Sequence, residues 1–278
     1  MHLSRALALE YAETQYLRAR VQGLASLPGN PYRACLYGEP GCGAFVVGGN
    51  PSPMMNRVHG DRAQDARRLV DLLQSCVAYA PAIALIAESA KVVPALELQG
   101  LPLQRLKGWT HGQLFAPVGE IVAPPSVLDI EPVTASTLEV FCTLHREGFN
   151  TPAAARPATQ AAFGGLLNDG RGHLYLLREQ GVAVAGAALF IADNGVAYLG
   201  TAFTTRAARG LGYHRALIAH RLQQAAALGA RSVAATALVN SQSRRNLEHC
   251  GLRLSHLQTL YRACLLYTSP SPRDQRGS

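Results

Sequence analysis

The stretch that decides the fold runs from Thr204 to Ile218 and reads TTRAARGLGYHRALI. It follows a strand-like run at Ala197–Phe203 and leads into a helix that we expect over Tyr213–Leu228. Gly210 and Gly212 permit backbone conformations that other residues avoid, and they leave room for a ligand to approach the amides. Free N–H groups and the positive end of the helix dipole meet at such a helix N-terminus. The stretch therefore predicts an anion-binding site.

Charge around the loop favours the same interpretation, because Arg206, Arg209 and Arg215 surround the two glycines. The loop is not a P-loop, since no G-K-[ST] follows it. Nor is it a dinucleotide-binding fingerprint, since the third glycine is missing. Many helices begin after a two-glycine loop without binding any ligand, and this alternative stays open at the level of the sequence.

The rest of the chain predicts two α/β units that share one order of elements. In the first unit we expect a helix at Ala6–Leu24, strands at Tyr32–Tyr37, Ala44–Val47 and Met55–His59, a helix at Arg62–Val77, a strand at Ile83–Ala87, a helix at Lys91–Leu98 and a strand at Leu103–His111. In the second we expect a strand at Val127–Glu131, helices at Ala135–Arg146 and Ala155–Leu167, strands at His173–Arg178, Val182–Ala192 and Ala197–Phe203, the helix from Tyr213, a strand at Ser232–Ala237, a helix at Ser241–His249 and a strand at Leu254–Tyr261. Several consecutive strands followed by one β-α-β crossover indicate a mixed sheet. The fold class is therefore α/β, with two tandem domains, each a central mixed sheet flanked by helices.

A predicted connector separates the two units. The segment Phe115–Pro125 carries three prolines, which disfavour both helices and central strands. We place the first domain at residues 1–116, the linker at 117–125 and the second domain at 126–263. Residues 264–278 resemble the conceptual translation of a sequencing adapter, so we expect a disordered tail that is dispensable for folding.

Composition excludes several classes of protein. Hydrophobic residues make up 48% and charged residues 16% of the chain, which rules out a disordered protein. The longest apolar run, Cys76–Ala87, is interrupted by Pro81 and is too short to span a membrane. No signal peptide is visible, so we expect a cytoplasmic protein. Of the 26 basic residues all but two are arginine, and with abundant Ala, Gly and Pro this indicates a GC-rich bacterial genome.

The net charge of +8 is compatible with a polyanionic ligand. No basic run with interleaved aromatic residues favours a nucleic acid over a small phosphate compound. The six cysteines form no C-x-x-C pair, and no histidine lies at metal-ligand spacing from any of them. We therefore expect reduced thiols, no disulfide framework and no metal, with Cys250 in the core rather than acting as a nucleophile.

Two motifs carry a family resemblance. The run RGLGYHRALI from Arg209 resembles the acetyl-CoA motif of the GNAT N-acetyltransferases, and NSQSRRNLEHCGL from Asn240 resembles their second signature. The order of elements from Val127 to Tyr261 is also that of the family, and the resemblance covers about half the chain. It implies a tandem GNAT protein that binds acetyl-CoA, with a degenerate first half.

The resemblance implies roles for particular residues. The CoA pyrophosphate would lie on the backbone N–H groups of Leu211, Gly212, Tyr213 and His214. The pantetheine arm would lie along the backbone of Phe203 and Thr205 and against the Asn240 side chain. The same motifs place four further residues in the predicted site: Arg209, Gly210, Ser243 and Asn246.

The motifs also depart from the family pattern. His214 stands where Gly or Ala is usual; it is either a titratable ring beside the phosphates or a simple surface residue. Leu247 stands where many members carry the tyrosine that protonates the departing thiolate, and the strand before the loop holds no carboxylate. The catalytic residues stay unknown. Glu147, His145 and Tyr198 are replacement candidates, although a structural role is the more ordinary interpretation of each.

The first half resembles the same fold without its ligand loop. Its strand Met55–His59 leads into Gly60 with no second glycine. Asp61 is a plausible helix N-cap and Asp65 lies in the first turn. Both place carboxylates where a pyrophosphate would have to lie, so we expect one acetyl-CoA per chain, in the second half.

The function implied is acyl-CoA-dependent N-acyl transfer (EC 2.3.1), in which a primary amine attacks the thioester directly. The alternative is a non-catalytic acyl-CoA-binding or scaffold protein, which the missing tyrosine and strand carboxylate favour. Expected partners are acetyl-CoA and an unidentified amine, with no nucleic acid and no membrane, in a monomer or homodimer. The sequence leaves the acceptor open among small amines, antibiotics, amino acids and protein N-termini.

Overall fold

A computed structural model describes residues 2–60, 65–86, 102–120 and 128–263 of the chain. The helices are α1 (His2–Ala25), α2 (Ala66–Ser75), α4 (Leu138–Gly148), α5 (Arg156–Asn168), α6 (Tyr213–Ala227) and α7 (Gln242–His249). The strands are β1 (Cys35–Glu39), β2 (Cys42–Val46), β3 (Arg57–Gly60), β4 (Ala82–Ile86), β5 (Leu103–Pro117), β6 (Asp129–Pro132), β7 (Gly172–Glu179), β8 (Val182–Ile191), β9 (Val196–Thr204), β10 (Ser232–Leu238) and β11 (Arg253–Ala263). The predicted mixed α/β class is confirmed, and most predicted elements occur within a few residues of their expected bounds.

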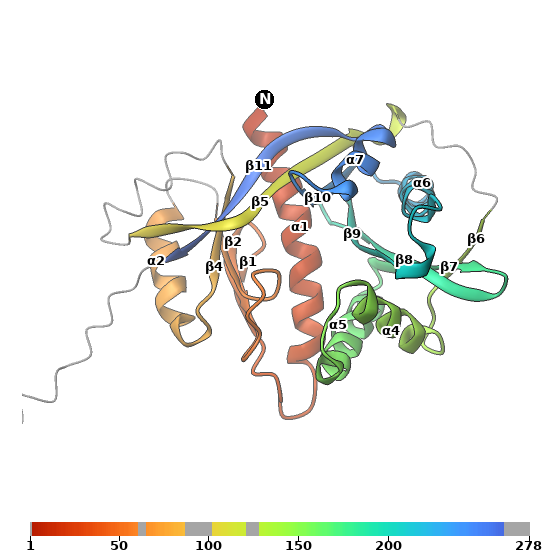
Figure 1. Ribbon diagram of the computed structural model, residues 1–278. Coiled ribbons are helices and arrows are strands. Elements are labelled where there is room, and N and C mark those ends of the chain that lie inside the picture. Colours follow the sequence, from red (N-terminus) through yellow and green to blue (C-terminus); the bar gives the residue numbers. More distant parts are fainter. Residues whose placement is uncertain (1, 61–64, 87–101, 121–127, 264–278) are drawn as a thin grey trace, which may run out of the picture.

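One continuous sheet joins the two halves. Its eleven strands follow the order β1-β2-β3-β4-β11-β5-β10-β9-β8-β7-β6 (Figure 1). The last strand of each half therefore lies beside a strand of the other half: β11 pairs with β4, and β5 pairs with β10. The two exchanged strands also pair with each other in antiparallel fashion.

The exchange corrects the expected connector. Phe115 and Pro117 belong to β5, where Phe115 pairs with Ala234 and Pro117 with Ser232. The boundary placed at residue 116 therefore falls inside a central strand. Pro117 is tolerated there because β11 pairs with β5 only as far as Phe115, so the missing N–H costs no bond on that side. The helix expected at Lys91–Leu98, residues 121–125, Asp61 and the tail from 264 lie outside the described residues.

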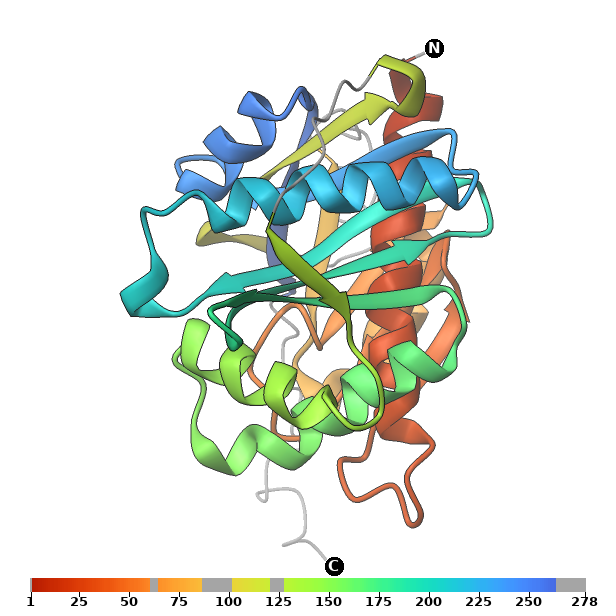
Figure 2. The same ribbon diagram turned by 90° about the vertical axis from the view of Figure 1, so that its right-hand side faces the viewer.

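Helices cover both faces of the second half of the sheet (Figure 2). Helices α4 and α5 pack on one face, in a core that includes Phe141, Phe163 and Phe190. Helix α6 packs on the other face, in a core that includes Leu217, Ile218 and Leu222. The alternation of side chains along β8 supplies both cores, with Phe190 on one face and Leu189 on the other.

Helix α1 crosses between the halves, although it belongs to the first (Figure 1). It packs against α5 and against β9 and β10 of the second half, as well as against β1 and β2. The contact with α5 is close because two glycines face each other. A Cβ atom on Gly23 would lie 2.9 Å from the Cα atom of Gly165. The sequence predicted the helix but not this position.

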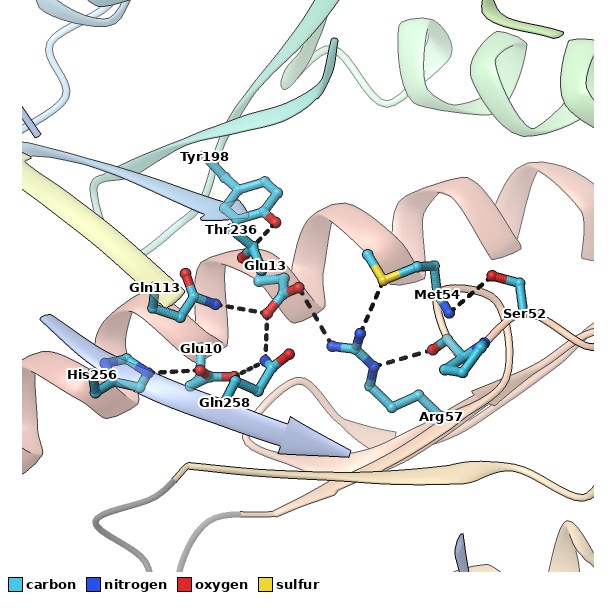
Figure 3. Close-up of polar contacts among 11 residues, drawn as sticks. Glu10, Glu13, Ser52, Met54, Arg57, Gln113, Tyr198, Thr236, His256 and Gln258 are labelled. Carbon is cyan, nitrogen blue, oxygen red and sulfur yellow. Dashed lines mark hydrogen bonds and ion pairs between the residues drawn. The ribbon is translucent and has the colours of Figure 1, made fainter. Parts of the chain in front are cut away.

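A buried polar network joins α1 to the exchanged strands (Figure 3). The Glu13 carboxylate accepts hydrogen bonds from Gln113 of β5 and Gln258 of β11, both at 2.7 Å. It also forms an ion pair at 3.4 Å with Arg57 of β3, and both side chains are almost fully buried. Glu10, one turn earlier, pairs with His256 Nε2 at 2.7 Å. Charged groups at such depth must be paired, so the network ties the two halves together.

Across the described ranges, no helix is long and apolar enough to cross a membrane.

Candidate functional site

The site begins where two parallel strands separate. β9 and β10 pair only from Val196↔Ser232 to Tyr198↔Ala234. Beyond these pairs β9 continues to Thr204 beside β8, and β10 continues to Leu238 beside β5. A wedge therefore opens between the two strands, with backbone on both of its walls.

A bulge in β9 shapes the wall of the wedge. The register with β8 shifts between Ala187↔Ala202 and Leu189↔Leu199, so Gly200 and Thr201 oppose a single residue. The buried Arg221 of α6 donates to the Gly200 carbonyl at 3.3 Å from one face. From the other face Tyr16 of α1 accepts the Thr201 N–H at 3.2 Å. The bulge is therefore held by both halves of the chain.

The glycine loop lies at the open end of the wedge. Gly210 and Gly212 have φ of +85° and +86°, a region in which other residues are strained. Gly212 is the N-cap of α6, and no side chain caps this helix end. Among the described residues, the amides of residues 210–215 have no hydrogen-bond acceptor in the protein. The predicted anion site therefore has free donors and a helix N-terminus directed at one point.

A cavity of about 730 Å³ adjoins this loop. Its lining includes Arg209, Arg215 and Arg245, and contains no Asp or Glu. A Cβ atom at Gly210 would meet no atom within 4 Å, so the space before the amides is open. Positive charge, open space and free N–H groups suit a pyrophosphate, and the cavity is long enough to continue along β9 past Phe203. The residues present fit acetyl-CoA.

Most of the predicted CoA-binding residues line this cavity: Phe203, Arg209, Gly210, Gly212, Tyr213, His214, Ser243 and Asn246. Three do not. The Thr205 N–H is bonded to the Val184 carbonyl, which keeps it in the sheet. The Leu211 side chain is exposed between the two glycines and offers only its backbone N–H. Asn240 lies in the exposed turn after β10 and lines neither cavity described here.

His214 is neither a surface residue nor a free cation. Its Nδ1 atom accepts a hydrogen bond from Asn246 at 2.8 Å, which joins α6 to α7. Burial lowers its pKa to about 4, and the nearby Arg221 acts in the same direction. The ring is therefore neutral near pH 7, and its contribution to an anion site is the backbone N–H.

A second cavity, of about 560 Å³, opens on the other side of the wedge. Ala202, His214 and Ser243 line both cavities, so the two meet there. Both halves of the chain supply its walls. Ten of the lining residues come from the first half, among them Tyr16, Arg20, Val47, Met54, Met55, Trp109 and His111.

The structure places two of the three catalytic candidates in the second cavity. His145 and Tyr198 line the second cavity, whereas Glu147 lines neither cavity and its side chain is 49% exposed. Burial lowers the pKa of His145 to about 3. Burial also raises the pKa of Tyr198 well above 10, and its hydroxyl donates to Thr236 at 2.9 Å. His145 is thus a weak base, and Tyr198 stays protonated.

Sequence reasoning assigned no residue of the first half to the site, and so missed Tyr16, Arg20 and His111 of the second cavity among others. Trp109 and His111 are two residues apart in β5 and therefore lie on one face of the strand. Any strand places residues in this way, so the sequence pattern does not indicate a functional site. In the described part of the chain, no group of three or more His, Cys, Asp or Glu residues could hold a metal ion. Cys250 is a free thiol, only partly buried, at the end of α7.

The sequence of the second half resembles a known protein family. Residues 136–252 match the profile of the acetyltransferase (GNAT) family. No curated protein matches the chain in sequence.

Solved structures match both halves. A GCN5-related N-acetyltransferase from Kribbella flavida aligns over 90% of this chain and 95% of its own, with 18% identity and a TM-score of 0.58. A tandem GNAT protein from the clavulanic acid biosynthesis pathway aligns over 91% and 96%, with 10% identity and a TM-score of 0.56. A GNAT-family acetyltransferase from Colwellia psychrerythraea aligns over 80% and 81%, with 14% identity and a TM-score of 0.54. These likenesses confirm the predicted fold, and residues 136–252 of this chain resemble the acetyltransferase (GNAT) family in sequence.

Proposed function

We propose that the protein is an acyl-CoA-dependent N-acyltransferase that moves an acetyl group from acetyl-CoA to an amine. One observation carries the proposal: the cationic cavity at the glycine loop meets a second cavity at the wedge between β9 and β10. The first cavity suits CoA, and the second has the size of a small acceptor site. The match of residues 136–252 to the acetyltransferase (GNAT) family supports acyl transfer in general.

Acetyl-CoA would supply a thioester, whose carbonyl carbon forms a bond to the amine nitrogen while the bond to sulfur breaks. The chain's own residues then have two tasks. The amides of residues 210–215 hold the pyrophosphate and fix the direction of the arm. A side chain in the second cavity takes the proton that the attacking amine loses.

We propose His111 as this proton acceptor. It lines the second cavity, and its Nδ1 atom has no hydrogen-bond partner among the described residues. Burial lowers its pKa, so the ring is neutral near pH 7; the Glu13 carboxylate opposes that shift, and Arg57 adds a smaller effect in the same direction as burial. His145 lacks such a carboxylate, and Arg20 lowers its pKa further, to about 3. His111 is therefore the stronger base of the two.

The test is release of free thiol from acetyl-CoA in the presence of a panel of amines, with mass detection of the acetylated product. We expect one class of amine to be acetylated. Loss of the base by His111→Gln should lower kcat by about 100-fold or more and leave acetyl-CoA affinity unchanged, whereas His145→Gln should lower kcat far less. Acetyl-CoA binding without thiol release for any amine would contradict the proposal and favour a non-catalytic acyl-CoA-binding protein.

A further inference from the structure

The charge of the second cavity restricts the acceptor. No Asp or Glu lines it, and its two charged side chains are both arginines, Arg20 and Arg221. The histidines that line it have lowered pKa values because they are buried, so they carry no charge near pH 7. The Glu13 carboxylate, which acts on His111, is paired with Arg57 and does not line the cavity. A cavity of this kind repels a purely cationic amine and attracts a ligand that also carries an anionic group.

The two arginines are not equivalent. Arg221 is almost fully buried and is satisfied by three backbone carbonyls, those of Leu217, Ala188 and Gly200. Its task is to hold the bulge in β9. Arg20 forms no ion pair with any carboxylate of the described residues, and its Nε atom has no hydrogen-bond partner. Only Arg20 has a guanidinium free for a ligand.

Aromatic rings fix the guanidinium of Arg20. Its Cζ atom lies 4.6 Å from the centroid of the Phe163 ring and 5.7 Å from that of Tyr16. A guanidinium held over a ring keeps its N–H donors at the edge, where they suit the two oxygens of a carboxylate. The arginine is therefore pre-organised without an internal partner.

The position of Arg20 relative to the wedge sets the length of the ligand. Tyr16, which accepts the Thr201 N–H at the bulge, lies four residues before Arg20 on α1. The Arg20 Cζ atom lies 5.7 Å from the centroid of the Tyr16 ring. An anionic group on Arg20 and an amine at the wedge are then separated by only a few bonds. The apolar side chains that line the same cavity include Met54, Met55 and Phe149.

We propose that the acceptor is an amino acid, whose carboxylate binds Arg20, whose amine lies at the wedge between β9 and β10, and whose apolar side chain packs against Met54, Met55 and Phe149. This inference rests on the proposed function, because the amine is the group that would be acetylated. It goes further in naming the class of acceptor and the residue that selects it.

The experiment compares matched acceptors. The twenty amino acids are assayed with acetyl-CoA beside their carboxamides, which keep the amine and the side chain but lose the negative charge. We expect apolar amino acids to exceed their carboxamides at least tenfold in kcat/KM. Arg20→Gln should lower kcat/KM for the amino acids at least tenfold, mainly through KM, and leave the carboxamides within twofold. Arg20→Lys should recover part of the loss.

The control is Arg5→Gln. Arg5 lies on the same helix and is stacked on an aromatic ring, with Cζ 4.3 Å from the centroid of Phe115, but it does not line the cavity. It should leave both acceptor classes unchanged. Acetyl-CoA affinity, measured by calorimetry, should be the same in all variants.

The outcomes distinguish this inference from the function on which it rests. Acetylation of amines with no preference for a carboxylate, or an equal loss for both classes in Arg20→Gln, overturns the inference and leaves the acyltransferase standing. If no amine is acetylated, calorimetric titration of the acetyl-CoA-loaded protein with the amino acids decides. Binding that Arg20→Gln abolishes supports the Arg20 site although the function fails, and absence of binding overturns both.

Discussion

The two halves contain the same crossover, a strand, a helix and a parallel strand, yet in the described part of the chain only the strands of the second half separate into a wedge. In the first half β3 and β4 pair from Arg57↔Ala82 to His59↔Ala84, and β3 ends one residue later. In the second half β9 runs six residues beyond its last pair with β10. A wedge needs strands that extend beyond their paired residues, and among the described residues this holds for β9 but not for β3.

The two helix starts differ in the same sense. Helix α2 begins after Asp65, a carboxylate, and a Cβ atom on Gly60 would lie 3.0 Å from Leu69 and Cys42. Helix α6 begins after two open glycines of positive φ with free amides before them. The carboxylate of Asp65 disfavours an anion at the first helix start, and we expect an anion to bind at the second. The order of elements alone therefore does not make a ligand site. The length of the strands and the residues at the helix N-terminus decide whether one is present.

The largest effect should come from separating the halves. A fragment of residues 126–263 lacks β5, the partner of β10 from Ser232 to Leu238, and lacks α1, which covers the wedge. We expect it not to unfold cooperatively in thermal melting followed by circular dichroism. Addition of residues 1–120 should restore the transition. Cooperative melting of the fragment alone, with full acetyl-CoA affinity, would show that the second half is independent.

Next in size is the loss of Glu13. Glu13→Ala leaves Arg57 buried without a carboxylate and leaves the amides of Gln113 and Gln258 without this acceptor. Urea denaturation should show a loss of about 3–5 kcal/mol in the free energy of unfolding. Glu248→Ala, which breaks an exposed pair with Arg244, should cost less than about 1 kcal/mol. Equal effects would mean that the network does not tie the halves together.

The ligand loop should respond more moderately. Gly212→Val places a side chain before the free amides, at a φ of +86° that strains it. Calorimetry should show acetyl-CoA binding weakened by about 2 kcal/mol or more, and Gly212→Asp should weaken it further. Gly229→Val is the matched control: it has a φ of +77° and lies just beyond the other end of α6. Similar acetyl-CoA affinities in both valine variants would mean that Gly212 only begins a helix and does not contribute to binding.

The smallest effect concerns pH. Burial lowers the pKa of His145 to about 3 and that of His214 to about 4, from an ordinary value of 6.5. Between pH 6.5 and about 4 the unfolded chain binds protons that the folded chain does not. The free energy of unfolding therefore falls as the pH decreases, by at most about 1.4 kcal/mol per pH unit for each ring.

Urea denaturation at several pH values between 7 and 5 measures this slope. His145→Phe should make the slope shallower, because one titrating ring is gone. His249→Gln changes an exposed ring on α7 and should keep the slope of the unchanged protein. A slope unaffected by His145→Phe would contradict the burial of a neutral ring at that position.

Local patterns carried the prediction of the fold a long way. The alternation of apolar residues located β7 to β10, and Gly210 and Gly212 located the loop, because these features depend on neighbours in the sequence. The exchange of β5 and β11 was missed, because the partner of a strand is set by tertiary packing rather than by its own residues. Pro117 made the error worse, since a proline at the end of a central strand looks like a connector.

Only part of the candidate site was predictable from the sequence. The residues of the loop and of α7 follow motifs, and most of them line the first cavity. Arg20 and His111 line the second cavity only because α1 and β5 cross into the second half. Neither carries a motif. Their position depends on the strand exchange, so a sequence reading that keeps the two halves apart cannot bring them to the wedge.

The most direct test of the central claim is amide hydrogen exchange of the full chain with and without saturating acetyl-CoA. The claim is that the free amides before α6 hold the ligand and that the equivalent region of the first half does not. We expect slower exchange in peptides covering residues 204–216 and no change in peptides covering residues 57–60 and 65–75. Protection confined to the first-half peptides, or no protection anywhere at saturation, would contradict the account.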